Sequence, residues 1–214
     1  MTTNFDFISK YYPTLGHETA TLVAVSCFTA NNKPKLLSGL INKVILDQCV
    51  DMSATESTSP EYLKKIQLVN LIEKARETIF KNVFTIGLPL DTVDSSNTIS
   101  EPHAYFIEDS PRYKKGHDHF VRTYGRVSTK LLNRLDSFHP DLVYSIIECV
   151  YSDILSNDAI LSDTESEIIT VAAICILDTP EQLFSHVRGA KRLGVAETSI
   201  EAILELSREI KNII

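Results

Sequence analysis

Two consecutive helix patterns lie in the stretch Glu165–Gly194, which reads ESEIITVAAICILDTPEQLFSHVRGAKRLG. Its first half is almost continuously apolar from Ile168 to Leu177, which is typical of a helix enclosed by neighbours rather than lying on the surface. The second half opens at Pro180, a residue favoured at the first helical position, and ends at a glycine. The stretch therefore predicts a central buried helix followed by an amphipathic one.

Both helices have start signals. Ser162 or Thr164, each with a glutamate three residues later, forms a capping box for the first helix, and Thr179 with Gln182 does so for the second. The second helix carries His186 on the face formed by its apolar residues at spacings i, i+3, i+4 and i+7. We therefore expect the imidazole of His186 to point into the protein.

At these residues the chain resembles the carboxymuconolactone decarboxylase and alkylhydroperoxidase D superfamily. That superfamily shares a buried helix, a helix with a histidine and a third helix, and here an apolar helix precedes SHVRGA and a new amphipathic pattern. The upstream text GRVSTKLLNRLDSFHPDLVYSIIECVYSDILSNDAILSDTE is similar to the fungal, partly peroxisomal branch of carboxymuconolactone-decarboxylase-like proteins. The resemblance, which is closest over the last third of the chain, implies an all-α, AhpD-like helical fold.

Peroxide-reducing members of that superfamily use a glutamate, two cysteines in a CxxC motif and a histidine four positions beyond the second cysteine. By spacing, Glu167 matches the glutamate and His186 the histidine. Thr179 and Gln182 stand where the two cysteines would be. A dithiol peroxidase needs one low-pKa thiolate and a neighbouring thiol that resolves the sulfenic acid. The chain is therefore not a CxxC-dependent peroxidase.

Neither the cysteines nor the clustered histidines have the spacing of a metal site. The four cysteines are scattered through apolar or helical contexts and read as small buried hydrophobes: Cys27, Cys49, Cys149 and Cys175. His117 and His119 are two residues apart and face different sides of a helix, so they do not chelate one ion. We expect a solvated helix start there.

Glu167 and His186 carry the catalytic hypothesis. If their helices pack antiparallel, the acid approaches the histidine and holds the imidazole in one tautomer, which suits His186 to general acid or base catalysis. The resemblance implies cofactor-free decarboxylation of a lactone acid. The imidazole would then deliver a proton to the carbon that loses its carboxylate, and Arg188 would hold the anionic substrate. We predict Glu167, His186 and Arg188 as catalytic residues, with no cofactor and no metal.

Each of these residues also has a structural interpretation. Glu167 would be the third residue of a capping box begun by Thr164, and His186 a core histidine satisfied by a carbonyl or by Glu167. Arg188 lies about 200° around the helix from His186, which makes a shared pocket less direct. Two classes of function therefore stay open. A lyase or isomerase acting on a small carboxylate predicts a water-accessible cavity beside His186, whereas a non-catalytic oligomeric scaffold or binding protein predicts that it is packed dry.

Composition excludes several classes of protein. The chain has 214 residues, of which 43% are hydrophobic and 23% charged, as in a globular protein of one domain. A net charge of −7 argues against a nucleic-acid partner. The sequence contains no apolar run of about 18 residues, so it predicts no membrane span. The N-terminus lacks signal-peptide features and the C-terminus is not of the Ser-Lys-Leu type. We expect an intracellular, cytoplasmic protein, with the peroxisome suggested by family association alone.

The N-terminal part has the layout of the C-terminal one. Two helix patterns run from Thr19 to Gln48 and divide before Pro34. A shift of 146 residues places Pro34 on Pro180 and Leu40 on His186. We predict a degenerate internal repeat whose N-terminal copy is a scaffold without the polar pair.

We predict a single all-α domain over residues 1–214 with three parts. A degenerate repeat spans 18–90, a loop or insertion spans 91–116, and a carboxymuconolactone-decarboxylase-like part spans 117–214. In the first part, Pro60 opens a long amphipathic helix that runs to Lys81. The loop has little periodicity, and it either covers a pocket or is an insertion without a role. Further helices should begin at His117 and at Pro140.

The last helix pattern, Ala196 to Ile214, has a continuous apolar face. That face offers surface to a partner helix, as in the homo-oligomers usual in the superfamily, or it folds onto the protein's own core. The predicted partners are a small organic acid and further copies of the chain, with no nucleic acid and no membrane.

Overall fold

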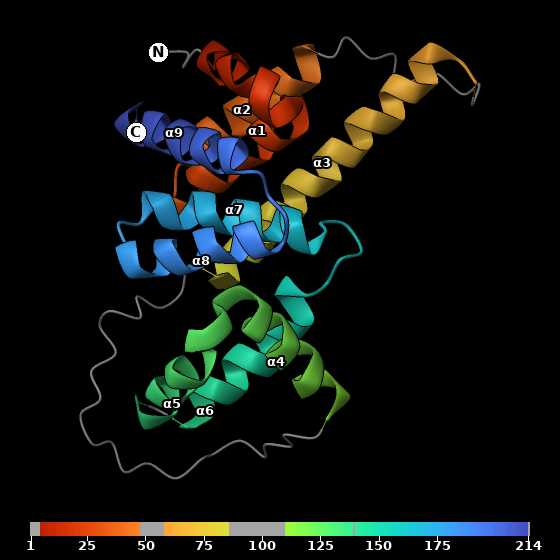
Figure 1. Cartoon of the computed structure of the whole chain (residues 1–214). Helices are drawn as coiled ribbons and strands as arrows, with labels where there is room; N and C mark the ends of the chain where they lie inside the picture. The colour runs from red at the N-terminus through yellow and green to blue at the C-terminus, as the bar shows by residue number, and fades with distance from the viewer. Residues whose placement is uncertain (1–4, 48–57, 86–109, 139, 214) are drawn as a thin grey trace.

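The computed structural model describes residues 5–47, 58–85, 110–138 and 140–213, and every regular element in these ranges is a helix. The predicted all-α class is confirmed (Figure 1). The α-helices are α1 (Tyr12–Ala30), α2 (Pro34–Asp47), α3 (Pro60–Thr85), α4 (Pro111–Tyr124), α5 (Ser128–Phe138), α6 (Pro140–Tyr144), α7 (Asp163–Ile176), α8 (Pro180–Arg192) and α9 (Glu197–Ile213). Two short 3₁₀ helices, η1 (Asp6–Tyr11) and η3 (Gly125–Val127), and a π-helix, η4 (Ser145–Leu155), complete the described elements.

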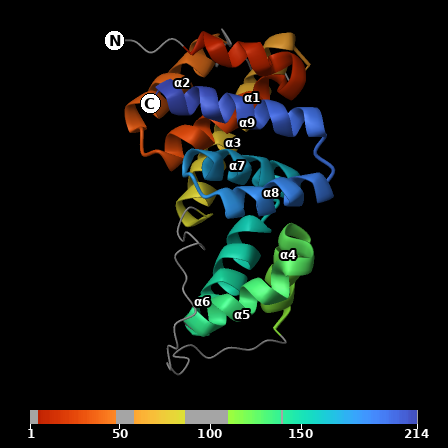
Figure 2. The same ribbon diagram turned by 60° about the vertical axis from the view of Figure 1, so that its left-hand side comes forward.

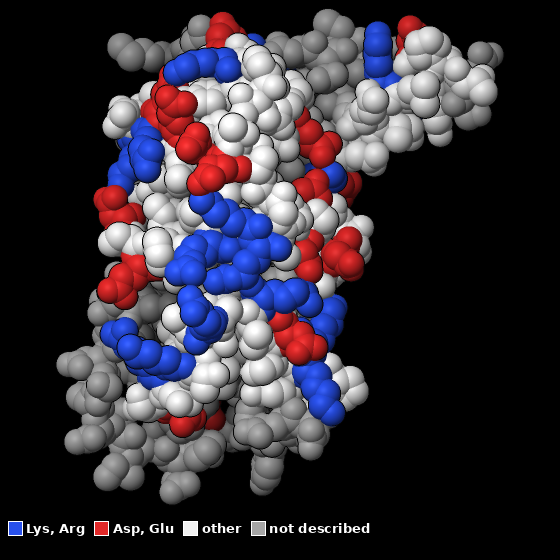
Figure 3. All heavy atoms as spheres, viewed as in Figure 1, with Lys and Arg blue, Asp and Glu red and all other residues white. Residues whose placement is uncertain are grey.

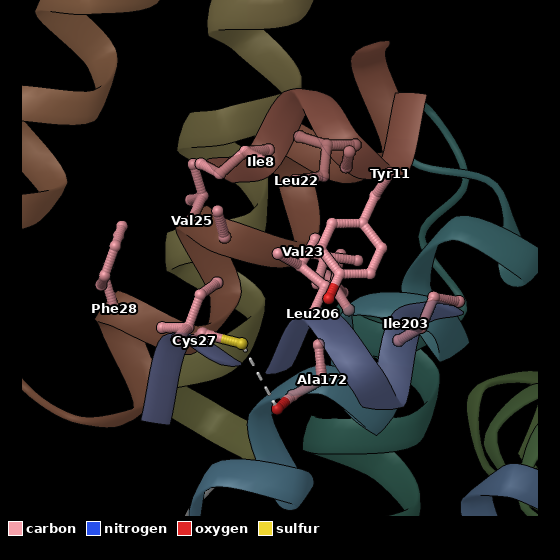
Figure 4. Close-up of a cluster of buried hydrophobic side chains, with 14 of the residues drawn as sticks. Ile8, Tyr11, Leu22, Val23, Val25, Cys27, Phe28, Ala172, Ile203 and Leu206 are labelled. Carbon is pink, nitrogen blue, oxygen red and sulfur yellow. Dashed lines mark hydrogen bonds between the residues drawn. The ribbon is translucent and has the colours of Figure 1, made fainter. Parts of the chain in front are cut away.

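The larger hydrophobic core is built around α1, which contacts α3, α7 and α9. Its residues from Ala20 to Phe28 are all buried, as expected for a helix without a polar stripe. Figure 4 shows Val23 and Cys27 of α1 beside Leu206 of α9 and Ala172 of α7. The Cys27 thiol donates to the carbonyl of Ala172 at 3.8 Å. Helices from both ends of the chain therefore share one core.

A second, smaller core lies between α4, α5, α6 and η4. Figures 1 and 2 both show these helices as a separate layer below α7 and α8. The core is rich in aromatic side chains and consists of Phe120, Tyr124, Leu135, Val143, Ile147, Tyr151 and Leu155. The predicted part 117–214 thus contributes to both cores, since α7 to α9 pack with α1.

A buried lysine joins the two cores. Lys81 of α3 is fully buried, and its Nζ donates to the carbonyls of Leu155 (3.3 Å) and Asn157 (2.8 Å) and to Ser166 Oγ (2.8 Å). The two carbonyls lie at the C-terminal end of η4, where a helix leaves acceptors unpaired and favours a cation. Burial lowers the pKa of Lys81. The end of the predicted amphipathic helix is therefore an internal contact and not a surface.

The predicted helix pairs have matching turns. The first pair divides at Asn32, whose φ is 51°, two residues before Pro34; the second divides at Asp178, whose φ is 56°, two residues before Pro180. These positions are separated by the same 146 residues that relate the two sequence patterns. Asn and Asp adopt the left-handed conformation more readily than other non-glycine residues. The matching turns agree with an internal repeat, which stays a prediction.

The helix expected at His117 begins earlier, at Pro111. Ser110 is its N-cap, and Ser110 Oγ accepts a hydrogen bond from the backbone N–H of Tyr113 at 2.9 Å. Pro111 lies within the predicted loop 91–116, but proline after a serine is also a helix start. Residues 91–109 lie outside the described part. Inside α4, Gly116 is needed because a Cβ there would lie 2.0 Å from the carbonyl oxygen of Ile147 in η4.

The helix expected after Pro140 changes its winding. It is α-helical only to Tyr144 and continues as the π-helix η4, in which the N–H of Ser156 bonds the carbonyl of Tyr151 at 3.0 Å. Residue composition does not distinguish a π-helix from an α-helix, so the sequence pattern could not predict this. The wider turn places Tyr151 against α4, and π-helical segments are frequent at functional sites.

Of the two predicted capping boxes, one forms. Ser162 Oγ accepts from the N–H of Glu165, and the Glu165 carboxylate accepts from the N–H of Ser162 at 2.9 Å. Thr164 is not the N-cap, so Glu167 is free of any capping role. The box expected at Thr179 and Gln182 is absent, because Thr179 makes no side-chain cap and its hydroxyl has no hydrogen-bond partner in the described part of the chain.

The last helix folds onto its own core. The apolar face of α9 is buried against the larger core at four positions: Ile200, Ile203, Leu206 and Ile210. This face therefore does not supply the surface for a partner helix that its sequence suggested. Among the helices described, none combines the length and apolar character needed to cross a bilayer.

Replacing Ser162 by alanine removes the one capping box at the start of α7. We expect Ser162→Ala to lower the free energy of unfolding by about 1 kcal/mol, measured by urea denaturation. Thr129→Ala is the matched control, since Thr129 is exposed on α5 and should leave stability nearly unchanged. Equal stabilities of the two variants would contradict a capping role for Ser162.

Candidate functional site

A buried chain of hydrogen bonds connects the two cores. Glu167 of α7 meets His186 of α8 at 2.9 Å, between Oε1 and Nδ1. The other ring nitrogen, Nε2, lies 3.1 Å from the hydroxyl of Tyr124 on α4. The hydroxyl of Tyr151, on η4, donates to that of Tyr124 at 3.3 Å. Four helices thus place one side chain each in a single polar chain.

The direction of these bonds follows from the acid at one end. A carboxylate can only accept hydrogen bonds, so Nδ1–H of His186 donates to the Glu167 carboxylate. Nε2 is then the acceptor of the hydrogen bond that the Tyr124 hydroxyl donates. The tautomer is assigned from this network. Glu167 therefore fixes which ring nitrogen faces Tyr124.

Close packing of α7 and α8 makes the pair possible. Glu167 is 4% exposed and so is His186, which means that both polar groups depend on each other for pairing. Gly189 lies one turn beyond His186, and a Cβ there would stand 2.5 Å from Glu167 Oε1. Any larger residue at this position would displace the carboxylate. The glycine of the SHVRGA motif is thus part of the site.

Burial keeps the two tyrosines protonated. It raises the pKa of Tyr124 from 10.0 to about 12, and it raises the pKa of Tyr151 well above 10.0. The loss of water around a phenolate is the main cause in both cases. At neutral pH both residues are therefore hydrogen-bond donors, and Tyr124 holds a proton next to His186.

The histidines at the start of the predicted part 117–214 are arranged differently from the expectation. His119 is buried on α4, with Nδ1 3.5 Å from Asp163, which also pairs with Arg122 at 3.0 Å. Burial lowers the pKa of His119. His117 instead stacks on Tyr113. The expected solvated helix start is therefore wrong for His119, and the described residues contain no group of three His, Cys, Asp or Glu that could hold a metal ion.

A cavity of about 520 Å³ lies where α8 meets the smaller core. Its walls come from the end of α4, from η3 and α5, and from α8. Five cations stand in these walls: Arg126, Lys130, Arg134, Arg188 and Arg192. Figure 3 shows a band of Lys and Arg side chains across the middle of the side of the molecule drawn there. The acid in the cavity wall is Glu181.

The cavity touches the buried chain at Tyr124. Tyr124 belongs to the cavity wall, whereas Glu167 and His186 do not. Arg192 of α8 reaches back to α4 and donates a hydrogen bond to the carbonyl of Thr123. Gly125 follows with a φ of 59°, and a Cβ there would lie 2.8 Å from the Arg192 guanidinium. The hydrogen bond from Arg192 to Thr123 thus joins α8 to the C-terminal end of α4, next to Tyr124.

The structure brings the three predicted site residues into one region but not onto one surface. Glu167 and His186 bond each other, and Arg188 stands in the cavity wall with its guanidinium 5.4 Å from the ring centre of Phe184. Tyr124 joins the pair to the cavity and is not among the residues that the sequence predicts for the site. Buried tyrosines usually find a partner for the hydroxyl, and this was the available signal.

Two of the described cysteines, Cys27 and Cys175, are buried. Burial raises the pKa of the Cys27 thiol to about 12 and also raises the pKa of the Cys175 thiol. Cys149 is partly exposed, and Cys49 lies outside the described residues. The buried, apolar reading holds for Cys27 and Cys175. A thiolate at Cys175 is therefore disfavoured.

Two proteins named Peroxisomal protein 2 are similar to this chain over most of its length. The one from Saccharomyces cerevisiae is 24% identical over 258 aligned positions, covering 94% of this chain and 89% of its own. The one from Schizosaccharomyces pombe is 25% identical over 198 positions, covering 88% and 84%. No family model and no solved structure matches the chain. The resemblance to carboxymuconolactone decarboxylases stays a prediction, and the relatives' names give a compartment without a reaction.

The raised pKa of Tyr124 predicts how stability changes in alkali. Between pH 10 and about 12 the folded protein keeps the hydroxyl proton of Tyr124, whereas the unfolded chain loses it. The contribution of this hydroxyl to the free energy of unfolding is therefore complete below pH 10 and is lost as the pH rises through about 12. We expect the unfolding free energy of the wild type to fall more steeply over this range than that of Tyr124→Phe. Urea denaturation at several pH values measures it. Tyr62→Phe should follow the wild type, and parallel curves for all three proteins would refute the assignment.

Proposed function

We propose that the chain is an acid–base enzyme, a lyase or isomerase of an organic acid that works with side chains alone. Tyr124 would be the catalytic residue, with His186 and Glu167 as positioning residues behind it and Arg188 as the group that holds the anion. The observation that carries the proposal is the position of Tyr124, which both lines the cationic cavity and is hydrogen-bonded to the buried Glu167–His186 pair.

The hydrogen-bond directions give each group a role. In an isomerisation, Tyr124 passes its proton to Nε2 of His186 as it takes one from the substrate carbon. Glu167 opposes the charge of the resulting imidazolium, and the reverse transfer returns a proton to a different carbon. In a decarboxylation, the bond to the carboxylate breaks, its electron pair stays on the carbon beside a carbonyl, and CO₂ leaves. Tyr124 protonates that carbon and regains its proton from water in the cavity.

The cations explain why an acid is the expected substrate. Arg188 and four further cations line the cavity together with one acid, Glu181, and arginine binds carboxylates with two parallel hydrogen bonds. The sequence offered no simple way for His186 and Arg188 to contact one substrate, because they lie on different sides of α8. A substrate that meets Tyr124 instead of His186 removes this difficulty, since Tyr124 and Arg188 line the same cavity.

The burial of His186 also supports a second candidate. At 4% exposure and outside the cavity wall, His186 fits a structural pair that fastens α8 to α7 and α4. The chain would then be a binding protein or scaffold that retains an organic acid without converting it. The two candidates differ in whether a proton moves between Tyr124 and the bound molecule.

Exchange of substrate protons with D₂O separates these candidates. We expect the wild type to exchange protons beside the carbonyl of a member of a panel of lactone acids and keto acids, followed by ¹H NMR. Tyr124→Phe should slow this exchange by about 100-fold or more, because the transferring group is lost. Glu167→Gln should alter the pH dependence of exchange, and Tyr62→Phe should behave as the wild type. If an acid binds but none of its protons exchanges, the enzyme proposal is wrong and the binding protein is the candidate that is left.

We also propose that the protein resides in peroxisomes, because both relatives that match most of its length are named peroxisomal proteins. A fluorescent fusion, tagged at either end in separate yeast strains, should give puncta that coincide with a peroxisomal matrix marker. A strain lacking peroxisomal import is the control, in which the puncta should disperse. Diffuse fluorescence of both fusions in import-competent cells would refute this location.

A further inference from the structure

We propose that the cationic cavity binds an organic phosphate with an apolar body, rather than a simple monocarboxylate. The cavity is that of the proposed function, and the inference deepens that function by naming the class of ligand. It rests on the proposed function only for the reaction at Tyr124, because the binding of a phosphate depends on other residues of the wall.

The cations form two rows on facing helices. Arg126, Lys130 and Arg134 recur every four residues, which places them on one side of η3 and α5 with about 6 Å between neighbours. Arg188 and Arg192 have the same spacing on α8. The longer row extends for about 12 Å. Positive charge is therefore spread along the cavity and not focused on one point.

Two cations of the cavity wall are not paired with an acid among the described residues. Within the part of the chain that the structure describes, Arg126 and Lys130 have no acid within ion-pair distance, and Glu181 is the acid in the wall. Cations that line one partly enclosed space repel one another more strongly than they would in open water. A multiply charged ligand would relieve this repulsion.

A phosphate ester satisfies these cations better than a carboxylate. It carries about −1.5 to −2 charges at neutral pH and three acceptor oxygens, whereas a carboxylate carries one charge and two oxygens. Arginine matches phosphate with two parallel bonds. Arg192 uses one donor on the Thr123 carbonyl, and a guanidinium has five. Arg192 therefore keeps donors that can bind a phosphate oxygen.

The rest of the wall suits an apolar body. Val127, Leu131 and Phe184 line the cavity between the cations. Phe184 is 62% exposed and Val127 is 49% exposed, so both present apolar surface to an incoming molecule. A volume of about 520 Å³ lies in the range of sites for ligands larger than a short acid. The ligand should therefore combine an acyl or aromatic body with its phosphate.

Octyl phosphate and octanoate test this preference, because they share an eight-carbon chain and differ in the head group. By isothermal titration below micelle concentrations, octyl phosphate should bind about tenfold or more tightly than octanoate. The double variant Arg126→Gln, Lys130→Gln should lose about tenfold in affinity for octyl phosphate. The control Lys35→Gln, Arg208→Gln removes the same charge from exposed positions on α2 and α9 and should bind as the wild type.

Vesicles identify the source of the phosphate. Co-sedimentation with phosphatidylcholine vesicles that contain phosphatidic acid, but not with phosphatidylcholine alone, would assign a lipid headgroup. Binding of octyl phosphate without co-sedimentation would assign a soluble organic phosphate. The inference would be overturned if octyl phosphate bound no more tightly than octanoate. It would also be overturned if the two double variants lost affinity for octyl phosphate equally. Titration measures no turnover, so a failure here leaves the proton-exchange test of Tyr124 standing, and the reverse also holds.

Discussion

The hydrogen-bonded chain from Glu167 through His186 to Tyr124 is the contact on which the arrangement of the two cores depends. Each member is almost fully buried, and a buried polar group without a partner costs about 1–3 kcal/mol. The positions of α7, α8 and α4 are therefore specified together, because a shift of any one helix would break a bond that water cannot replace. Lys81 adds a second polar connection between the same cores at the end of η4.

Close backbone contacts support this polar chain. Gly189 lets α8 approach the Glu167 carboxylate, and Gly116 lets α4 approach the carbonyl of Ile147 in η4. The π-helical winding of η4 then sets Tyr151 beside Tyr124. Small residues and a wider helix turn thus place two tyrosine hydroxyls next to an imidazole inside a tight interior. The same contacts that stabilise the fold orient the group that reaches the cavity.

The distribution of charge shows why net charge alone describes this protein poorly. The chain carries −7 overall, yet five cations from η3, α5 and α8 surround one cavity. The net charge and the absence of a long basic run argued against a nucleic-acid partner. Neither measure detects a cluster of cations that two helices bring together. Local potential in a partly enclosed space depends on nearby charges, since bulk water and salt screen distant ones. An anionic small molecule is compatible with both observations.

Sequence by itself located the central helices of the larger core, because apolar period and start signals are local. The apolar pattern of α7 and Pro180 of α8 marked these two helices, and Ser162 was one of two residues predicted as the N-cap of α7. It also paired Glu167 with His186, by resemblance and spacing, and the tertiary structure places them in contact. Only the tertiary structure decided that His119 is buried, that α4 begins at Pro111 and that Tyr124 connects the pair to a cavity. These features arise where α4 and η4 pack against α7 and α8, and such contacts between distant segments depend on packing that no local pattern encodes.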